Sequence, residues 1–256
     1  QDITEKKMEE QLEIAVQKYN GERIVKIFTS GSFLDGKEVP LNLQIKILKK
    51  FFEKADRILI ESRPEFIKNL DLLGSIPGNK TLEVAMGLES ANDRVRKYSI
   101  NKGFTFSKWM DAAKAVIDRN MQLKTYILIK PAFLTEEESI KDALFSVKKV
   151  AGISDTVSFN PVAIHANTLV EYLWKRGVYR PPWLWSVAEI LERTSDMFDR
   201  QIKCDVVAGG RQRGAHNCGK CDNSFMNAIV WLEHAVQSDA FKGLRCGCRE
   251  EWLDSL

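Results

Sequence analysis

Several features that mark other classes of protein are scarce or missing in this sequence of 256 residues. No apolar run approaches the roughly 20 residues needed to cross a bilayer, and the N-terminus mixes acidic and basic residues instead of resembling a signal peptide. There is no internal repeat and no low-complexity segment. The formal net charge is only +3, which does not identify a nucleic-acid-binding protein, although a local basic patch is compatible with it. These absences predict a cytoplasmic protein.

What is present is typical of a folded domain. Hydrophobic residues make up 44% of the chain and charged residues 29%, enough to build one large domain or one domain with an appendage. The chain has five cysteines, and four of them fall within about the last forty residues. In a reducing compartment, such clustering favours a metal site over a disulfide framework.

Short β-branched runs alternate with helical patterns along most of the chain. We expect strands at residues 23–30, 57–61, 81–86, 123–129 and 156–159. We expect helices at 3–18, 41–54, 64–73, 106–119 and 135–150, the last opening with a capping box of Thr135 and Glu138. The alternation, at intervals of about 25–40 residues, favours a parallel sheet with crossover helices. It ends near residue 201, so the expected domains are an α/β domain over 1–200 and a cysteine-rich extension over 201–256.

Polar residues follow each expected strand. Ligands of parallel sheets bind at the carboxyl ends of the strands, so five polar strand ends in succession predict a pocket for a polar ligand. The alternative is that Ser, Gly, Asn and Pro at these positions serve only as turn and capping residues. The residues concerned are Ser30, Gly31, Ser32, Glu61, Arg63, Glu89, Ser90, Lys130 and Asn160.

The C-terminal cysteines form two pairs with metal-ligand spacing. Cys218 and Cys221 form a CxxC turn, and Cys246 and Cys248 form a CxC pair. Together they suit a tetrahedral structural zinc site, with His216 as an alternative ligand for one CxC thiol. The other interpretations are an auxiliary iron–sulfur cluster, and unliganded thiols or disulfides.

Basic and aromatic residues near this segment allow two interpretations. The arginines and lysines are compatible with contacts to an RNA backbone or with an ordinary solvated surface. Trp183 and Trp185, with Tyr179 and Arg180, suit either a platform for stacking bases or a helix that packs its apolar face into the core. We expect core packing for most of them. The basic residues are Arg211, Arg213, Lys220, Lys242, Arg245 and Arg249.

Six strings, in order, resemble the radical S-adenosylmethionine (SAM) proteins. The chain is similar first to the elongator catalytic subunit class, and more closely to the archaeal archaeosine biosynthesis radical SAM proteins. The likeness runs from about residue 3 to 185. The strings are TSGSF, ESRPE, EVAMGLES, INKGFTF, YILIKP and NPVAIHANTLVEYLWKRGVYRPPW.

The resemblance implies a fold with one departure from the family pattern. The expected fold is a radical SAM-type partial (βα)6 barrel that lacks its first strand, followed by the zinc-binding extension. Such proteins carry a CxxxCxxC loop whose thiolates hold a [4Fe–4S] cluster. This sequence contains no such spacing. We therefore expect an N-terminally truncated protein, inactive by itself in cleaving SAM; a naturally clusterless relative is the alternative.

The resemblance also implies site residues. Those for SAM are Ser30, Gly31, Ser32, Glu61, Arg63, Glu89, Ser90 and Asn160. Those for substrate are Lys102, Lys130 and Arg180. For Glu61 and Arg63 the alternative is a local ion pair or a helix cap, and for the lysines an ordinary solvated surface.

The activity implied by the resemblance is lyase-type tRNA modification. A partner subunit first joins lysine to the 7-cyano-7-deazaguanine base of tRNA. A 5′-deoxyadenosyl radical then abstracts a hydrogen from that lysine, and cleavage of a C–N bond leaves the formamidine of archaeosine. Two alternatives remain: an elongator-like radical SAM tRNA-modifying enzyme, and a noncatalytic, zinc-stabilised tRNA-binding scaffold.

Overall fold

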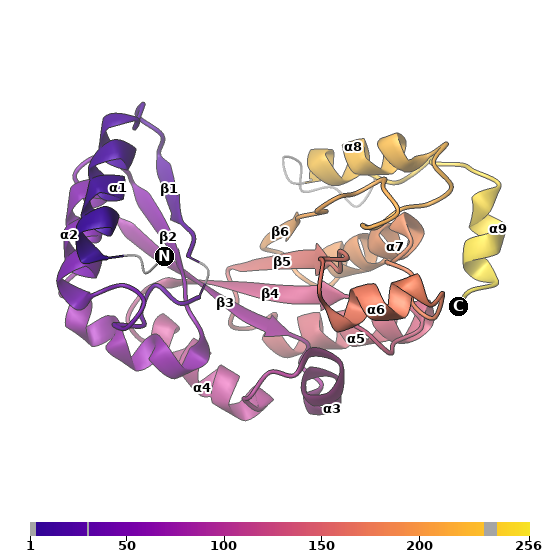
Figure 1. The fold of residues 1–256 in the computed structure, drawn as a ribbon, viewed down its shortest axis with the longest axis horizontal. Helices are drawn as coiled ribbons and strands as arrows, with labels where there is room; N and C mark the ends of the chain where they lie inside the picture. The colour runs from indigo at the N-terminus through magenta and orange to yellow at the C-terminus, as the bar shows by residue number, and fades with distance from the viewer. Residues whose placement is uncertain (1–3, 30, 233–239) are drawn as a thin grey trace. The chain divides into compact units, whose positions relative to one another are not determined.

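The fold is α/β, with parallel strands separated by helices along the chain (Figure 1). The computed structural model describes residues 4–29, 31–232 and 240–256. The sheet order, β1-β2-β3-β4-β5-β6, follows the sequence. The strands are β1 (Ile24–Ile27), β2 (Arg57–Glu61), β3 (Thr81–Glu89), β4 (Gln122–Ile129), β5 (Thr156–Pro161) and β6 (Gln201–Cys204). The expected parallel sheet with crossover helices is confirmed.

The helices agree with the periodicity of the sequence to within a few residues. A Thr135–Glu138 capping box opens the helix after β4, as expected. The segment after β2 is a 3₁₀ helix that begins at Pro64. The α-helices are α1 (Glu5–Gln17), α2 (Leu41–Phe52), α3 (Asp93–Val95), α4 (Phe106–Ile117), α5 (Glu136–Val150), α6 (Leu169–Lys175), α7 (Leu184–Ser195), α8 (Asp222–Leu232) and α9 (Cys248–Leu253). The 3₁₀ helix is η1 (Pro64–Leu73), and a π-helical turn is η2 (Arg96–Ile100).

Two strands extend further than the sequence pattern indicated. We expected the third strand to end at residue 86 and the fifth at 159, but β3 includes Glu89 and β5 includes Pro161. The additional strand residues are not β-branched, so the sequence pattern did not include them. Hydrogen bonding along the sheet does not require β-branched side chains. Glu89 and Asn160 are therefore strand residues instead of loop residues.

The chain divides into two compact units. Unit 1 comprises residues 1–87 and 107–124, and unit 2 comprises 88–106 and 125–256. In unit 1, α1 lies along α2 through three polar pairs at successive turns: Asn42 with Glu5, Lys46 with Glu9 and Lys50 with Glu13. These pairs are partly exposed and contribute little stability individually.

In unit 2 the cysteine-rich segment is held by aromatic packing. The ring of Trp185 in α7 meets Phe225 of α8 edge-on at 4.5 Å between centroids and stacks on Trp252 of α9 at 6.0 Å. Such pairs contribute about 0.5–1.5 kcal/mol each beyond the burial of their area. The strand β6 pairs with β5 at the edge of the sheet, and the domain boundary expected near residue 201 stays a prediction.

Trp183, Trp185 and Tyr179 are all buried, so core packing is confirmed for these aromatic residues.

Among the described residues, no helix is long and apolar enough to span a membrane.

Candidate cofactor, substrate and metal sites

The four C-terminal cysteines converge on one point in unit 2. Their sulfurs all lie within 4.8 Å of one another. Sγ of Cys218 is 3.5 Å from Sγ of Cys246, and Sγ of Cys221 is 3.7 Å from Sγ of Cys248. Four sulfurs bound to a single zinc at about 2.3 Å would lie about 3.8 Å apart. The spacing therefore fits one tetrahedral metal ion.

Hydrogen bonds hold the Cys218–Cys221 turn and Cys248 in position. Asn217 donates its amide N–H to Sγ of Cys221 at 3.3 Å, and Trp185 donates its indole N–H to Sγ of Cys248 at 3.4 Å. The carboxylate of Asp222 accepts the backbone N–H groups of Asn217 and Gly219. Gly219 has φ of +87°, a conformation that glycine adopts without a Cβ clash. Such surroundings orient metal ligands before the metal arrives.

The thiols differ in their affinity for protons. The backbone N–H of Lys220 lowers the pKa of Cys218 to about 7, whereas burial raises the pKa of Cys248 to about 12. Burial also raises the pKa of Cys221. A metal ion that binds all four as thiolates must therefore displace protons from the buried pair.

His216, the alternative ligand, lies outside this group of sulfurs. Its Nδ1 is 2.8 Å from the carbonyl oxygen of Gly214, and burial lowers its pKa. The described geometry thus favours the CxC thiols over the imidazole.

In unit 1, the predicted SAM residues form a compact strand-end structure. The Ser32 hydroxyl is fully buried, lies 2.9 Å from the Ser62 hydroxyl and accepts the backbone N–H of Arg63. The backbone carbonyl of Glu61 accepts the N–H of Phe33 at 2.8 Å. Arg63 forms an ion pair with Glu65 at 3.1 Å, and both side chains are about half exposed. The alternative of a local ion pair named Glu61 as the partner of Arg63, whereas this pair is with Glu65. Ser30 lies outside the described residues.

Glu38 is a carboxylate at this strand end that the sequence analysis missed. Its Oε2 accepts the backbone N–H of Ser32 at 2.7 Å. A Cβ added to Gly31 would come within 2.0 Å of this carboxylate, so only glycine leaves room for it. The polar strand ends gave no signal for Glu38, because this residue follows the end of β1 by eleven residues.

In unit 2, the predicted SAM residues differ in accessibility. Glu89, with φ of +67°, forms an ion pair with Lys102 at 2.6 Å. Ser90 is fully buried and donates its hydroxyl to Asp142 at 2.9 Å. Asn160 is half-buried in β5. A positive φ in a non-glycine residue stores backbone strain, which proteins tolerate most often at functional sites.

Two predicted substrate residues line one cavity in unit 2. Lys130 and Arg180 both border a cavity of about 510 Å³ that also includes Tyr179 and Trp183. The guanidinium of Arg180 lies 3.7 Å from the centroid of the Trp183 ring. Lys102, the third predicted substrate residue, does not line this cavity.

A buried polar network anchors Lys130 to the C-terminal segment. The ammonium of Lys130 pairs with the carboxylate of Glu136, which also accepts the hydroxyl of Ser186. The indole N–H of Trp252 in α9 donates to that hydroxyl at 2.9 Å. Sequence reasoning missed Glu136, which lies in the acidic first turn of α5 and resembles an ordinary helix-start residue.

The predicted basic residues of the C-terminal segment differ in pairing and exposure. Arg213 is engaged within unit 2: it pairs with Glu171 at 2.7 Å and, as the largest cause, lowers the pKa of that carboxyl to about 2. The remaining five predicted basic residues are exposed: Arg211, Lys220, Lys242, Arg245 and Arg249.

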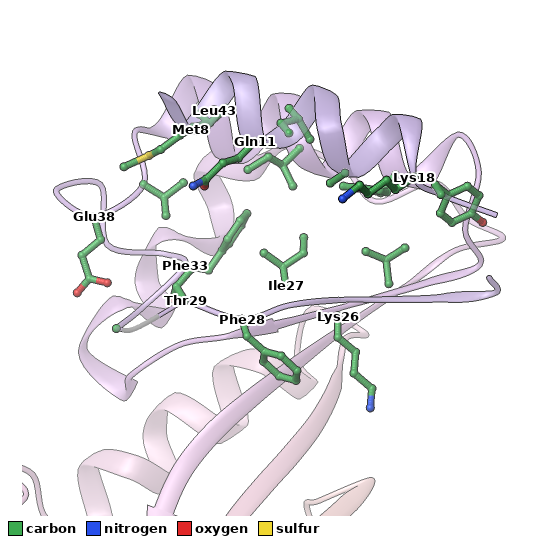
Figure 2. Close-up of a pocket in the computed structure, with 18 of the residues that line it drawn as sticks. Met8, Gln11, Lys18, Lys26, Ile27, Phe28, Thr29, Phe33, Glu38 and Leu43 are labelled. Carbon is green, nitrogen blue, oxygen red and sulfur yellow. The ribbon is translucent and has the colours of Figure 1, made fainter. Parts of the chain in front are cut away.

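Unit 1 contains a larger cavity, which the predicted SAM residue Gly31 and the carboxylate residue Glu38 both line. It measures about 1020 Å³ and lies between α1, α2 and the edge strand β1. Figure 2 shows Ile27 pointing into this space, while Lys26 and Phe28 point away from the helices.

Comparison with solved structures identifies the class of fold. Elp3 of Methanocaldococcus infernus, carrying an N-terminal deletion of residues 1–46, matches with a TM-score of 0.62 at 16% identity, over 94% of this chain and 59% of that one. The fold is therefore the α/β half-barrel type of Elp3, as expected.

Comparison with curated sequences identifies the family. Archaeosine synthase subunit beta of Methanosarcina acetivorans is 38% identical over 253 residues, covering 96% of this chain and 73% of that protein. The subunit of the same name from Thermococcus kodakarensis is 39% identical over 234 residues, covering 89% and 72%. No family model matches the chain. The chain belongs to the archaeosine synthase subunit beta family.

Proposed function

We propose that this chain is the SAM-binding, substrate-cleaving component of a cytoplasmic archaeosine synthase that acts on tRNA. The supporting observation is the 38% identity with an archaeosine synthase subunit beta across 96% of the chain. The substrate is a tRNA whose 7-deazaguanine base carries a lysine adduct made by a separate lysine-transferring subunit. The product is the formamidine of archaeosine, left when a C–N bond of the adduct breaks.

In this family, SAM and a [4Fe–4S] cluster together supply a 5′-deoxyadenosyl radical. The cysteines of this chain do not fit that cluster, because no three have the CxxxCxxC spacing and the four that converge are spaced for a single ion. We therefore assign no step of the reaction to a cluster held by residues 1–256.

The strand-end residues fit a polar cofactor to different degrees. Among them, Glu61, Glu89 and Asn160 are half-buried, as a residue that contacts a ligand would be. Ser32 and Ser90 are fully buried, and we assign them to bracing the strand ends through their hydrogen bonds. The backbone at Gly31 would approach the methionine group of SAM, with Glu38 as a carboxylate for its ammonium.

Lys130 and Arg180 would contact the substrate from their shared cavity. Arg180 is half-buried, and its planar guanidinium, which also donates to the backbone carbonyls of Pro181 and His216, suits a phosphate or carboxylate. The four cysteines would hold a structural zinc that fixes the C-terminal segment and leaves no coordination position open for substrate.

The decisive test measures archaeosine directly. Lysine-adduct tRNA is incubated with the chain, SAM, iron, sulfide and a strong reductant, and the nucleosides are analysed by mass spectrometry. We expect adduct tRNA to bind but no archaeosine to form from residues 1–256 alone. Activity should appear when an in-frame CxxxCxxC segment precedes residue 1. Failure of that longer protein to convert the adduct would contradict the proposed activity.

A second candidate is a noncatalytic, zinc-stabilised tRNA-binding scaffold. It is favoured by the four converging cysteines together with the lack of a CxxxCxxC spacing. The genomic sequence upstream of Gln1 separates the two candidates: a CxxxCxxC in frame within about thirty codons supports the enzyme, and its absence supports the scaffold.

A further inference from the structure

A second cavity in unit 2 gathers exposed aromatic side chains. It measures about 550 Å³. Tyr98 (66% exposed), Phe133 (61%) and Phe145 (43%) all line it. They are three of the six large aromatic residues exposed in the described part of the chain. Exposing three such rings at one place costs hydrophobic free energy and is typical of a binding surface.

The backbone around these rings is firmly held. Tyr98 lies in the π-helical turn η2, which begins at the fully buried Arg96. The guanidinium of Arg96 donates to the backbone carbonyls of Ser90 and Phe104 and to the carboxylate of Asp93. Phe133 has φ of +71°. The rings are thus presented by a braced turn and a strained residue, features that recur at functional sites.

Cations lie beside the rings. The ammonium of Lys97 is 5.2 Å from the centroid of Tyr98, and that of Lys149 is 5.4 Å from the centroid of Phe145. Arg94 lines the same cavity. In the described residues these three cations form no ion pair, so they remain available to an anionic ligand.

Both acidic residues of the cavity, Glu138 and Asp142, are engaged in hydrogen bonds within the protein. Glu138 is engaged in the capping box, where it accepts the backbone N–H of Thr135 at 2.9 Å. Asp142 is buried, and its carboxylate accepts the hydroxyl of Ser90 at 2.9 Å.

We propose that this cavity binds an unpaired nucleotide of RNA, whose base stacks on Tyr98 and Phe145 and whose phosphates meet Lys97, Lys149 and Arg94. Every base has a π-face, and aromatic rings interleaved with cations are the usual way in which proteins hold single-stranded nucleic acid. A volume of about 550 Å³ lies in the range of small-ligand cavities and suits a nucleotide, not a duplex. The cavity adjoins the one lined by Lys130 and Arg180, since Phe133 and Leu134 line both.

This inference rests on the proposed function, which supplies tRNA as the substrate, and it adds a nucleotide-binding site outside the predicted SAM and substrate residues. The neighbouring nucleotide of the same strand would then enter the substrate cavity. Phosphate contacts would position the strand, and stacking would hold one base out of its helix.

The test is a fluorescence-anisotropy titration of an unmodified tRNA transcript with the full chain. The double variant Tyr98→Ala/Phe145→Ala should bind roughly 25-fold or more weakly, because each lost stack weakens binding about 5- to 150-fold. Tyr98→Phe/Phe145→Tyr keeps both rings and should bind as the wild type does. Lys97→Gln/Lys149→Gln should lower the slope of log affinity against log salt by up to about two.

Tyr172→Ala is the matched control, since this exposed ring also carries a cation, with Arg176 at 4.3 Å. It should leave tRNA affinity unchanged, and thermal unfolding should show that all variants are folded. Wild-type affinity in the double alanine variant, or equal loss in Tyr172→Ala, overturns the site but leaves the proposed function standing. If the double alanine variant loses binding to the lysine-transferring subunit but keeps its affinity for tRNA, the surface binds protein and the RNA proposal is overturned. A wild-type chain without affinity for tRNA overturns both.

Discussion

At the scale of single residues, burial changes the chemistry of polar groups more than their sequence context suggests. Lys130 looks like an ordinary strand-end lysine in the sequence. In the structure its ammonium is held by buried Glu136, and the phenol of Tyr179 donates to its backbone carbonyl at 2.7 Å. Replacing only one member of such a pair leaves the other charge buried without compensation. Lys130 is therefore fixed in position before any substrate binds.

Asp142 gives a residue-scale prediction of pH dependence. Burial raises its pKa from 3.8 to about 6, against the opposing effects of Ser90 and Arg96. Because the folded pKa lies above the unfolded one, the associated stability is present below about pH 4 and is lost as the pH rises through about 6. Asp142→Asn removes this penalty and should stabilise the protein by up to about 3 kcal/mol at pH 7.5, with little effect at pH 4.

Urea unfolding of wild type and variant at pH 4, 6 and 7.5 measures this difference. Asp111→Asn, an exposed carboxylate on α4, is the control and should show no comparable pH dependence. A stability difference for Asp142→Asn that stays constant across the range would contradict the assigned pKa.

At the scale of elements, the group of four cysteines joins α8 and α9 to α7. Cys221 precedes α8, Cys248 begins α9, and Trp185 of α7 contacts Cys248 through its indole N–H. The short α9 has only six residues and would not be stable as an isolated helix. A metal at the four sulfurs would therefore supply the cross-link that keeps these helices in place.

Metal removal tests this role. Anaerobically purified protein should contain about one zinc per chain by elemental analysis. A strong chelator, or Cys248→Ser, should lower the thermal unfolding midpoint and expose Trp252, which is 5% exposed in the folded protein. Cys204→Ser, at a cysteine of β6 outside the cluster, is the control and should retain the metal. Protein without zinc and with an unchanged midpoint would rule out the structural-metal role.

At the scale of the whole molecule, tRNA affinity should depend on the exposed cations of the C-terminal segment. Replacing Arg211 and Arg245 with Gln should weaken tRNA binding and reduce its salt dependence by about two in slope, because each phosphate contact releases counterions. Arg213→Gln should act differently: its guanidinium pairs with Glu171, so stability should change more than affinity. Gel-shift titrations at two salt concentrations measure both. If the double variant binds tRNA as tightly as the wild type at both salt concentrations, these charges only solubilise the surface.

The sequence by itself determined the order of strands and helices, the parallel sheet and the cysteine spacing. Local patterns suffice for these features, because β-branched runs, the Thr135–Glu138 capping box and the CxxC turn act over a few residues. The order of the family strings also indicated the archaeosine synthase relationship, which the identity with curated relatives shows.

Only the tertiary structure decided which of the predicted polar site residues are paired within the fold. Ser32, Ser90 and Arg213 looked like binding residues, but each is engaged by a partner distant in sequence: Ser62, Asp142 and Glu171, respectively. The aromatic cavity at Tyr98, Phe133 and Phe145 likewise joins a π-helical turn, a loop and α5, up to 47 residues apart. A sequence pattern records the spacing of neighbours along the chain, whereas burial and pairing depend on which distant segments fold against one another.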